Sequence, residues 1–123
     1  MSHIVQIQSQ VRDAEAVQAA CRRLGLLAAV QRSARLFSGS ITGLAVQLPG
    51  WTYPAVCQLD SGQVKFDNYG GAWGDQKEMD RFLQAYAIER ARIEARKKGY
   101  TVTEQALTDG SVKLTIHVAG GAA

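Results

Sequence analysis

The segment from Asp75 to Gly99 constrains the fold more than any other part of the chain, because it carries a complete set of helix signals. Asp75 and Glu78 have the spacing of a capping box, in which the Asp75 carboxylate accepts from the Glu78 amide and Glu78 reaches back. A basic turn at 96–98 and then Gly99 end the pattern. The apolar residues between these signals recur at helical spacing and therefore predict one buried face: Met79, Phe82, Leu83, Tyr86 and Ala87.

The amino-terminal part of the chain predicts a strand, a helix and a further strand. Residues 3–10 alternate between apolar and polar side chains, which is typical of a half-buried strand. Asp13 is a suitable N-cap for a helix over 14–24, and Gly25 is a suitable residue to end it. A short strand is expected at 26–30.

The rest of the chain predicts antiparallel strands. Residues 41–66 have the pattern of a meander, with a tight turn at 60–63. Strand patterns at 100–107 and 112–118 flank an Asp-Gly turn, which is a strong hairpin signal. The order is β-α-β, then a β-meander, then α-β-β. We therefore expect an α+β fold with a largely antiparallel or mixed sheet and two helices packed on one face.

Length and composition indicate one globular domain. The chain has 123 residues, of which 46% are hydrophobic, and no Pro/Gly/Ser-rich linker divides it. A chain of this length can bury a core without help from a metal or a disulfide. We expect a single domain over 1–123, with 119–123 as a frayed tail.

Cysteine use and the first residues bear on the compartment. Cys21 and Cys57 lie far apart in the sequence, with no metal-ligand spacing, so we expect them to be reduced and buried. No basic segment followed by an apolar run opens the chain, and no apolar window is long enough for a membrane span. The expected location is the cytoplasm, or the stroma if the chain is encoded by a plastid, with no membrane partner.

The two ends of the chain resemble a known family. The matching segments are residues 1–3 followed by a strand and a helix at Asp13, residues 99–105, and residues 109–114. In these segments the chain is similar to the hypothetical chloroplast reading frame thirty-five family, small proteins of plastids, cyanobacteria, other bacteria and phages that form a domain of unknown function. The resemblance implies no established activity.

Catalytic patterns are missing from the sequence. No HExxH, GxSxG, CxxC or P-loop pattern occurs. Only His3 and His117 could act as bases at neutral pH, and they would approach each other if the first and last strands paired. They are weak candidates for a metal site, whereas solvent-facing histidines are the simpler interpretation. We expect a protein that is not an enzyme and needs no cofactor.

Four aromatic residues in loops are the candidate partner-binding residues. Trp51 and Tyr53 follow a Pro-Gly turn, and Tyr69 and Trp73 lie in a glycine-rich loop before the long helix. Such residues are either lids over the core or anchors for a partner. The expected function is therefore that of a small accessory or adaptor protein that binds an unidentified protein through these loops or through a sheet edge. Self-association through a sheet edge or face is open.

The alternative function is nucleic-acid binding. The net charge is only +3, and basic residues in the last turns of helices have a structural explanation in the helix dipole. Residues 31–40 are weakly patterned and are interpreted as a mobile basic loop, which could act together with the long helix. The candidate residues for this function are Arg32, Arg35, Arg90, Arg92 and Lys97.

Overall fold

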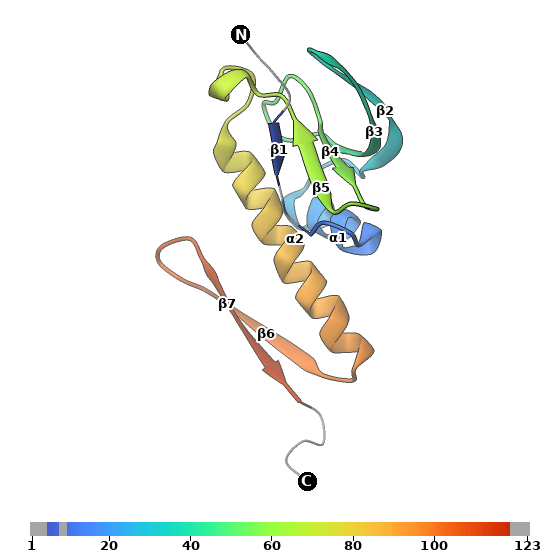
Figure 1. Ribbon diagram of the computed structural model, residues 1–123. Coiled ribbons are helices and arrows are strands. Elements are labelled where there is room, and N and C mark those ends of the chain that lie inside the picture. The colour runs from blue at the N-terminus through green and yellow to red at the C-terminus, as the bar shows by residue number, and fades with distance from the viewer. Residues whose placement is uncertain (1–4, 8–9, 119–123) are drawn as a thin grey trace.

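The structure is a computed structural model that describes residues 5–7 and 10–118 (Figure 1). It confirms the expected α+β class. No helix in these ranges is long and apolar enough to cross a bilayer. In chain order the elements are β1 (Val5–Ile7), α1 (Ala14–Leu24), β2 (Val30–Leu36), β3 (Gly39–Val46), β4 (Ala55–Gln58), β5 (Gln63–Phe66), the 3-10 turn η1 (Tyr69–Gly71), α2 (Gln76–Lys97), β6 (Thr101–Ala106) and β7 (Val112–His117).

The strands form two separate antiparallel sheets. Five strands make the larger sheet in the order β1-β5-β4-β3-β2, and β6 pairs only with β7. Figure 1 shows the β6–β7 hairpin beside the second half of α2, at the end of the molecule away from η1 and the tip of the β2–β3 hairpin. The expectation of a single sheet therefore needs correction: the carboxyl-terminal hairpin packs on a helix instead of extending the meander.

The core lies between one face of the larger sheet and both helices. Leu44, Cys57 and Val64 are cross-strand neighbours on that face, and all three are buried. They share one apolar cluster with Val17 of α1 and Phe82 of α2. The two helices also contact each other. The prediction that both helices cover the same face is confirmed.

The helix starts show which capping predictions are correct. Asp13 Oδ1 accepts hydrogen bonds from the amides of Glu15 and Ala16, at 2.9 and 3.3 Å, and Gly25 ends α1 with φ of 70°. Asp75 caps α2 as expected, but its carboxylate accepts from Lys77 N at 2.9 Å. The Glu78 side chain lies 3.3 Å from Arg81 instead. The N-cap is confirmed and the reciprocal capping box is wrong.

Two predictions around residue 30 are wrong, one of a strand and one of a loop. Residues 26–29 are not a strand, and the expected mobile loop at 31–40 is mostly a strand followed by a tight turn. β2 pairs with β3 from Val30↔Ala45 to Leu36↔Gly39. Pairing with a neighbour stabilises this polar segment as a strand, although its own pattern is weak.

The β2–β3 hairpin bends over the outer face of the sheet. The outer half of the hairpin contributes Ala34, which is buried in a small cluster with Ala45 and Val56 of the sheet. Gly43 of β3 lies close to β4: a Cβ there would stand 2.7 Å from the Cys57 carbonyl oxygen. Glycine is thus required by close backbone contact. The curl of this hairpin is visible in Figure 1.

Glu104 ties the β6–β7 hairpin to both helices. Its carboxylate pairs with Arg23 of α1, and Arg92 of α2 donates to it at 2.8 Å. Near the hairpin tip, Gln84 Nε2 donates to the Gly110 carbonyl oxygen at 3.2 Å. Polar contacts therefore hold the hairpin at two points along α2.

These contacts predict a pH-dependent contribution of Glu104 to stability. The hydrogen bond from Arg23, aided by the charge of Arg92, lowers the pKa of Glu104 below its ordinary value near 4.5. A carboxylate with a lowered pKa in the folded state stabilises that state above the unfolded pKa, and the effect is lost as the pH falls through the folded pKa. Glu104→Gln is therefore expected to lower the free energy of unfolding at pH 7. The difference from wild type should shrink toward zero in acid, as followed by denaturant unfolding. A difference that stays constant with pH would contradict this origin.

Candidate functional site: an exposed aromatic cluster

Trp73 contacts three other aromatic rings, and the four residues come from three separate loops. The Tyr69 ring stacks on it, with centroids 4.7 Å apart and an interplanar angle of 22°. Phe37 lies 5.2 Å away and tilted, and Tyr53 lies 5.6 Å away in an edge contact. We call Phe37, Tyr53, Tyr69 and Trp73 the Trp73 cluster. These separations are typical of stabilising aromatic pairs.

Backbone hydrogen bonds place the two loops that carry Tyr53, Tyr69 and Trp73. The Thr52 amide donates to the Trp73 carbonyl oxygen at 2.8 Å, and the Trp73 amide donates to the Asn68 carbonyl oxygen at 2.9 Å. The Asn68 side chain is buried and donates to the Gly74 carbonyl oxygen at 3.3 Å. The third loop is the turn of the β2–β3 hairpin, which carries Phe37 to the same place.

Tyr69 adopts a backbone conformation that tyrosine disfavours. Its φ is 49°, and it is the only residue other than glycine with a positive φ among those that the structure describes. The Tyr69 amide donates to the buried Asp67 carboxylate at 3.4 Å, while Asp67 Oδ2 has no hydrogen-bond partner in the described ranges. Left-handed conformations of ordinary residues cost about 1 kcal/mol or more and are concentrated at functional sites.

The rings of the Trp73 cluster are open to solvent. Phe37 is 56% exposed and Tyr69 is 45% exposed, whereas Tyr53 and Trp73 are half-buried. Large rigid rings in such a setting provide apolar contact area with little loss of side-chain entropy on binding. The surface is suited to receiving apolar side chains of another molecule.

The prediction that Trp51 is a partner-binding residue needs correction, because the structure buries its side chain. It is only 5% exposed, its ring packs edge-on against Phe66, and its Nε1 donates to the Asp75 carbonyl oxygen at 3.0 Å. It is therefore a lid over the core, which was one of the two interpretations of the aromatic loops. Tyr53, Tyr69 and Trp73 are brought together as one surface.

Phe37 belongs to the Trp73 cluster but was missed in the sequence. It lies two residues after Arg35, in the segment that the sequence predicts to be a mobile loop. The strand alternation that ends at buried Leu36 could have shown that Phe37 follows at a hairpin turn. Its distance of 36 residues from Trp73 gives no local signal for their contact.

The five basic candidates do not form one acid-free surface. Arg32 and Arg35 differ by an odd number of positions on β2, so their side chains leave opposite faces of the strand. The three on α2 lie close to carboxylates. Arg90 is 3.1 Å from Glu94 and 3.6 Å from Asp13, Arg92 is 2.8 Å from Glu104, and Lys97 is 3.8 Å from Glu94.

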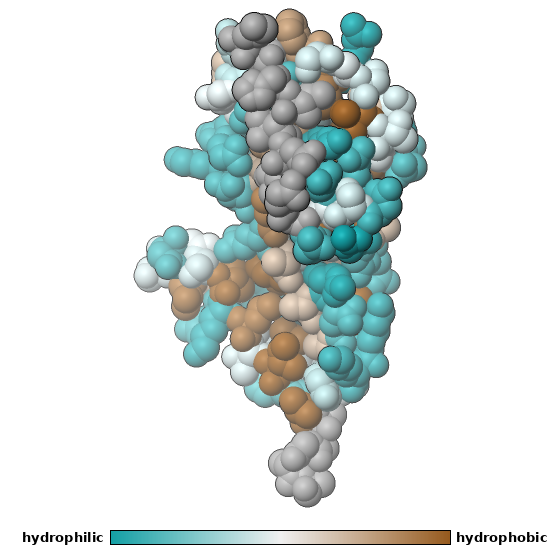
Figure 2. All heavy atoms as spheres, in the orientation of Figure 1, coloured by the Kyte–Doolittle hydropathy of each residue, from teal (hydrophilic) through white to brown (hydrophobic). Residues whose placement is uncertain are grey.

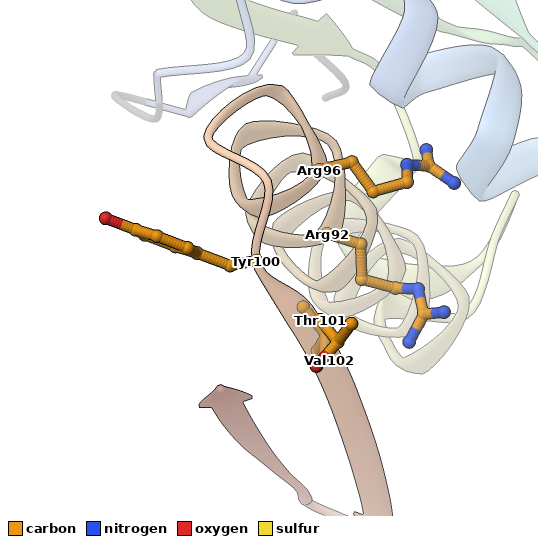
Figure 3. Close-up of a pocket in the computed structure, with 5 residues that line it drawn as sticks. All are labelled: Arg92, Arg96, Tyr100, Thr101 and Val102. Carbon is orange, nitrogen blue, oxygen red and sulfur yellow. The ribbon is translucent and has the colours of Figure 1, made fainter. Parts of the chain in front are cut away.

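A small pocket near the end of α2 includes one of these arginines. It has a volume of about 240 Å³ and is lined by Arg92, Arg96, Tyr100, Thr101 and Val102. Figure 3 shows the two arginine side chains pointing to one side of the helix and Tyr100 pointing away from them. The Arg92 charge is already matched by Glu104.

The two histidines are the candidate residues for a base or a metal site. His3 lies outside the described residues, and the strand pairing that would bring it to His117 is wrong, because β1 pairs with β5 and β7 pairs with β6. His117 Nε2 lies 3.3 Å from the Thr103 hydroxyl.

Cys21 and Cys57 are free and buried, and burial raises the pKa of the Cys57 thiol to about 12. Burial also raises the pKa of the Cys21 thiol, so both thiols are protonated near neutral pH. Within the described ranges, no three potential metal ligands are grouped together.

No protein-family model, curated protein or solved structure matches the chain.

Proposed function

We propose that the chain is a small protein-binding accessory module whose partner docks on the Trp73 cluster. The observation that carries this proposal is the convergence of Phe37, Tyr53, Tyr69 and Trp73 on one surface, with the first and third of them about half exposed. Tyrosine and tryptophan are the residues most enriched where partners bind tightly. The module acts by binding rather than by catalysis.

A structural role alone leaves the position of this cluster unexplained. Trp51 already closes the core beneath the loops, and its ring fills the space beside Gly74. The Trp73 cluster lies outside this lid, and its Phe37 and Tyr69 rings are about half exposed to solvent. Its Tyr69 also holds a disfavoured backbone conformation. Exposed apolar surface and local backbone strain together are typical of binding sites.

Variants of the cluster test the proposal. Purified wild type and Trp73→Ala are each used to capture proteins from an extract of the source cells, and the captured partner is then titrated directly in purified form. We expect Trp73→Ala to weaken this binding by about tenfold or more, because hot-spot truncations cost about 2 kcal/mol or more. Tyr69→Ala should weaken it in the same direction.

The matched control is Leu27→Ala. Leu27 is 78% exposed and lies outside the cluster, so this variant also removes exposed apolar area. It should bind the partner as wild type does. Circular dichroism must show that all variants are folded. Equal binding by wild type and folded Trp73→Ala would refute the proposal.

The cellular location of the module and the family to which it belongs are part of the same proposal. We place it in the cytoplasm or in the stroma of a plastid, and we assign it to the hypothetical chloroplast reading frame thirty-five family. The support is the set of matching segments at the two ends of the chain, 1–3, 99–105 and 109–114. Membership is tested by building a sequence profile of that family and asking whether it aligns over these segments and the long helix.

A further inference from the structure

The β6–β7 hairpin has an apolar face that α2 covers only in part. Val102 pairs with Ile116 and Glu104 pairs with Leu114, so these four side chains share one face of the hairpin. Glu104 on this face reaches α1 and α2. Val102 and Leu114 are half-buried, but Ile116 is 47% exposed. A two-stranded hairpin needs cover on its apolar face to be stable in water.

The adjoining side of α2 also carries small and apolar side chains that the described residues cover only in part. Leu83, Ala87 and Ala91 repeat every fourth residue and line a groove of about 420 Å³. Ala87 is exposed and Ala91 is half-buried. Figure 2 shows the brown and tan spheres of the hairpin and of α2 as one continuous patch on the lower half of the molecule. Continuous apolar patches of this kind mark interfaces.

Charges at the ends of this side of α2 indicate what covers it. Asp80, Ala87 and Ala91 follow one another at spacings of seven and four, which keeps them on the same side of α2, and the C-cap Lys98 follows Ala91 by another seven residues. Asp80 and Lys98 are both exposed. When two such helices lie antiparallel with Ala87 of one opposite Ala91 of the other, Asp80 of each lies opposite Lys98 of the other. A parallel pair would place like charges together.

We propose that the occupant of this surface is a second copy of the chain, paired through antiparallel α2 helices. The small side chains of Ala87 and Ala91 allow the helices to approach closely, and the two Asp80–Lys98 pairs set the direction. Twofold symmetry puts both hairpins on the same side of the helix pair, each toward its own end of the pair. This surface shares no residue with the Trp73 cluster, so the proposal stands apart from the proposed function.

Sedimentation equilibrium over a wide range of concentration tests this pairing. Wild type is expected to be a reversible dimer, and Ala87→Arg is expected to be monomeric because a long charged side chain cannot fit between the helices. Leu27→Arg, which adds the same charge at an exposed position elsewhere, should dimerise as wild type does. A monomeric wild type at every concentration, or a dimer that Ala87→Arg leaves intact, would overturn the proposal.

Charge reversal tests the direction of the helices. Asp80→Lys or Lys98→Asp alone should weaken dimerisation about tenfold, because each replaces two attractive pairs with repulsive ones. The double variant Asp80→Lys/Lys98→Asp restores both pairs and should dimerise nearly as wild type does. Both positions are exposed, so the variants are expected to fold. Failure of the double variant to recover, when the single variants are weakened, would exclude the antiparallel arrangement.

Discussion

Trp51→Ala is expected to lower the free energy of unfolding by about 4 kcal/mol, the size typical of removing a large aromatic side chain from a core. The ring is almost fully buried, packs against Phe66 with centroids 5.4 Å apart, and donates to the Asp75 carbonyl oxygen. The substitution therefore opens a cavity and also leaves a carbonyl oxygen near the start of α2 without its donor. Guanidinium unfolding followed by circular dichroism measures the loss.

Trp73→Ala provides the matched comparison, because it removes the same side chain from the neighbouring loop. Trp73 is half-buried and contacts rings that are themselves partly in water. Its loss should cost about 1 kcal/mol, since much less apolar area leaves the protein interior. If both variants lose the same stability, the division between a lid at Trp51 and a binding surface at Trp73 is wrong.

Gly74→Ala is expected to destabilise the fold by about 2 to 3 kcal/mol, because it forces a methyl group into filled space. A Cβ on Gly74 would stand 2.4 Å from Cδ2 of Trp51 and 2.6 Å from its Cγ and Cε2. The indole cannot move away cheaply, since Phe66 and the hydrogen bond to Asp75 hold it. Thermal or denaturant unfolding measures the effect.

Two further variants separate this clash from a backbone effect. Gly50→Ala meets no atom within 4 Å, but φ there is 72°, so only backbone strain of about 1 kcal/mol is expected. In a Trp51→Ala background the clash partner is absent, and Gly74→Ala should then cost much less than it does in wild type. An equal loss of stability from Gly74→Ala in both backgrounds would show that the clash with the Trp51 ring is not its cause.

Local signals were enough to predict most of the elements. Asp13 and Gly25 define α1, the apolar stripe defines α2, and Asp109-Gly110 defines the last hairpin, because each depends on neighbours in the sequence. β2 was missed because its stability depends on pairing with β3 and on the burial of Ala34 against the sheet, which are tertiary effects.

The candidate site was only partly visible in the sequence for the same reason. Tyr53, Tyr69 and Trp73 stood out as aromatic residues beside glycines and turns. Nothing local distinguished them from Trp51, whose burial depends on contacts with Phe66 and Gly74. The partners of Arg90 and Arg92 include Asp13 and Glu104, which only the fold brings close. Sequence patterns therefore suggested which residue types matter, and the packing decided which of them face solvent.

The length of α2 has a consequence for how the chain would hold a partner. Its 22 residues extend about 33 Å, with the Trp73 cluster near the first turn and the hairpin along the second half. An antiparallel pair of such helices would point its two aromatic clusters in opposite directions. Each assembly would then be bivalent and could bridge two partner molecules or grip a repeated motif. The overall affinity for such a partner would rise, because binding at one cluster raises the effective concentration of the partner at the other. No new contact at either cluster is needed.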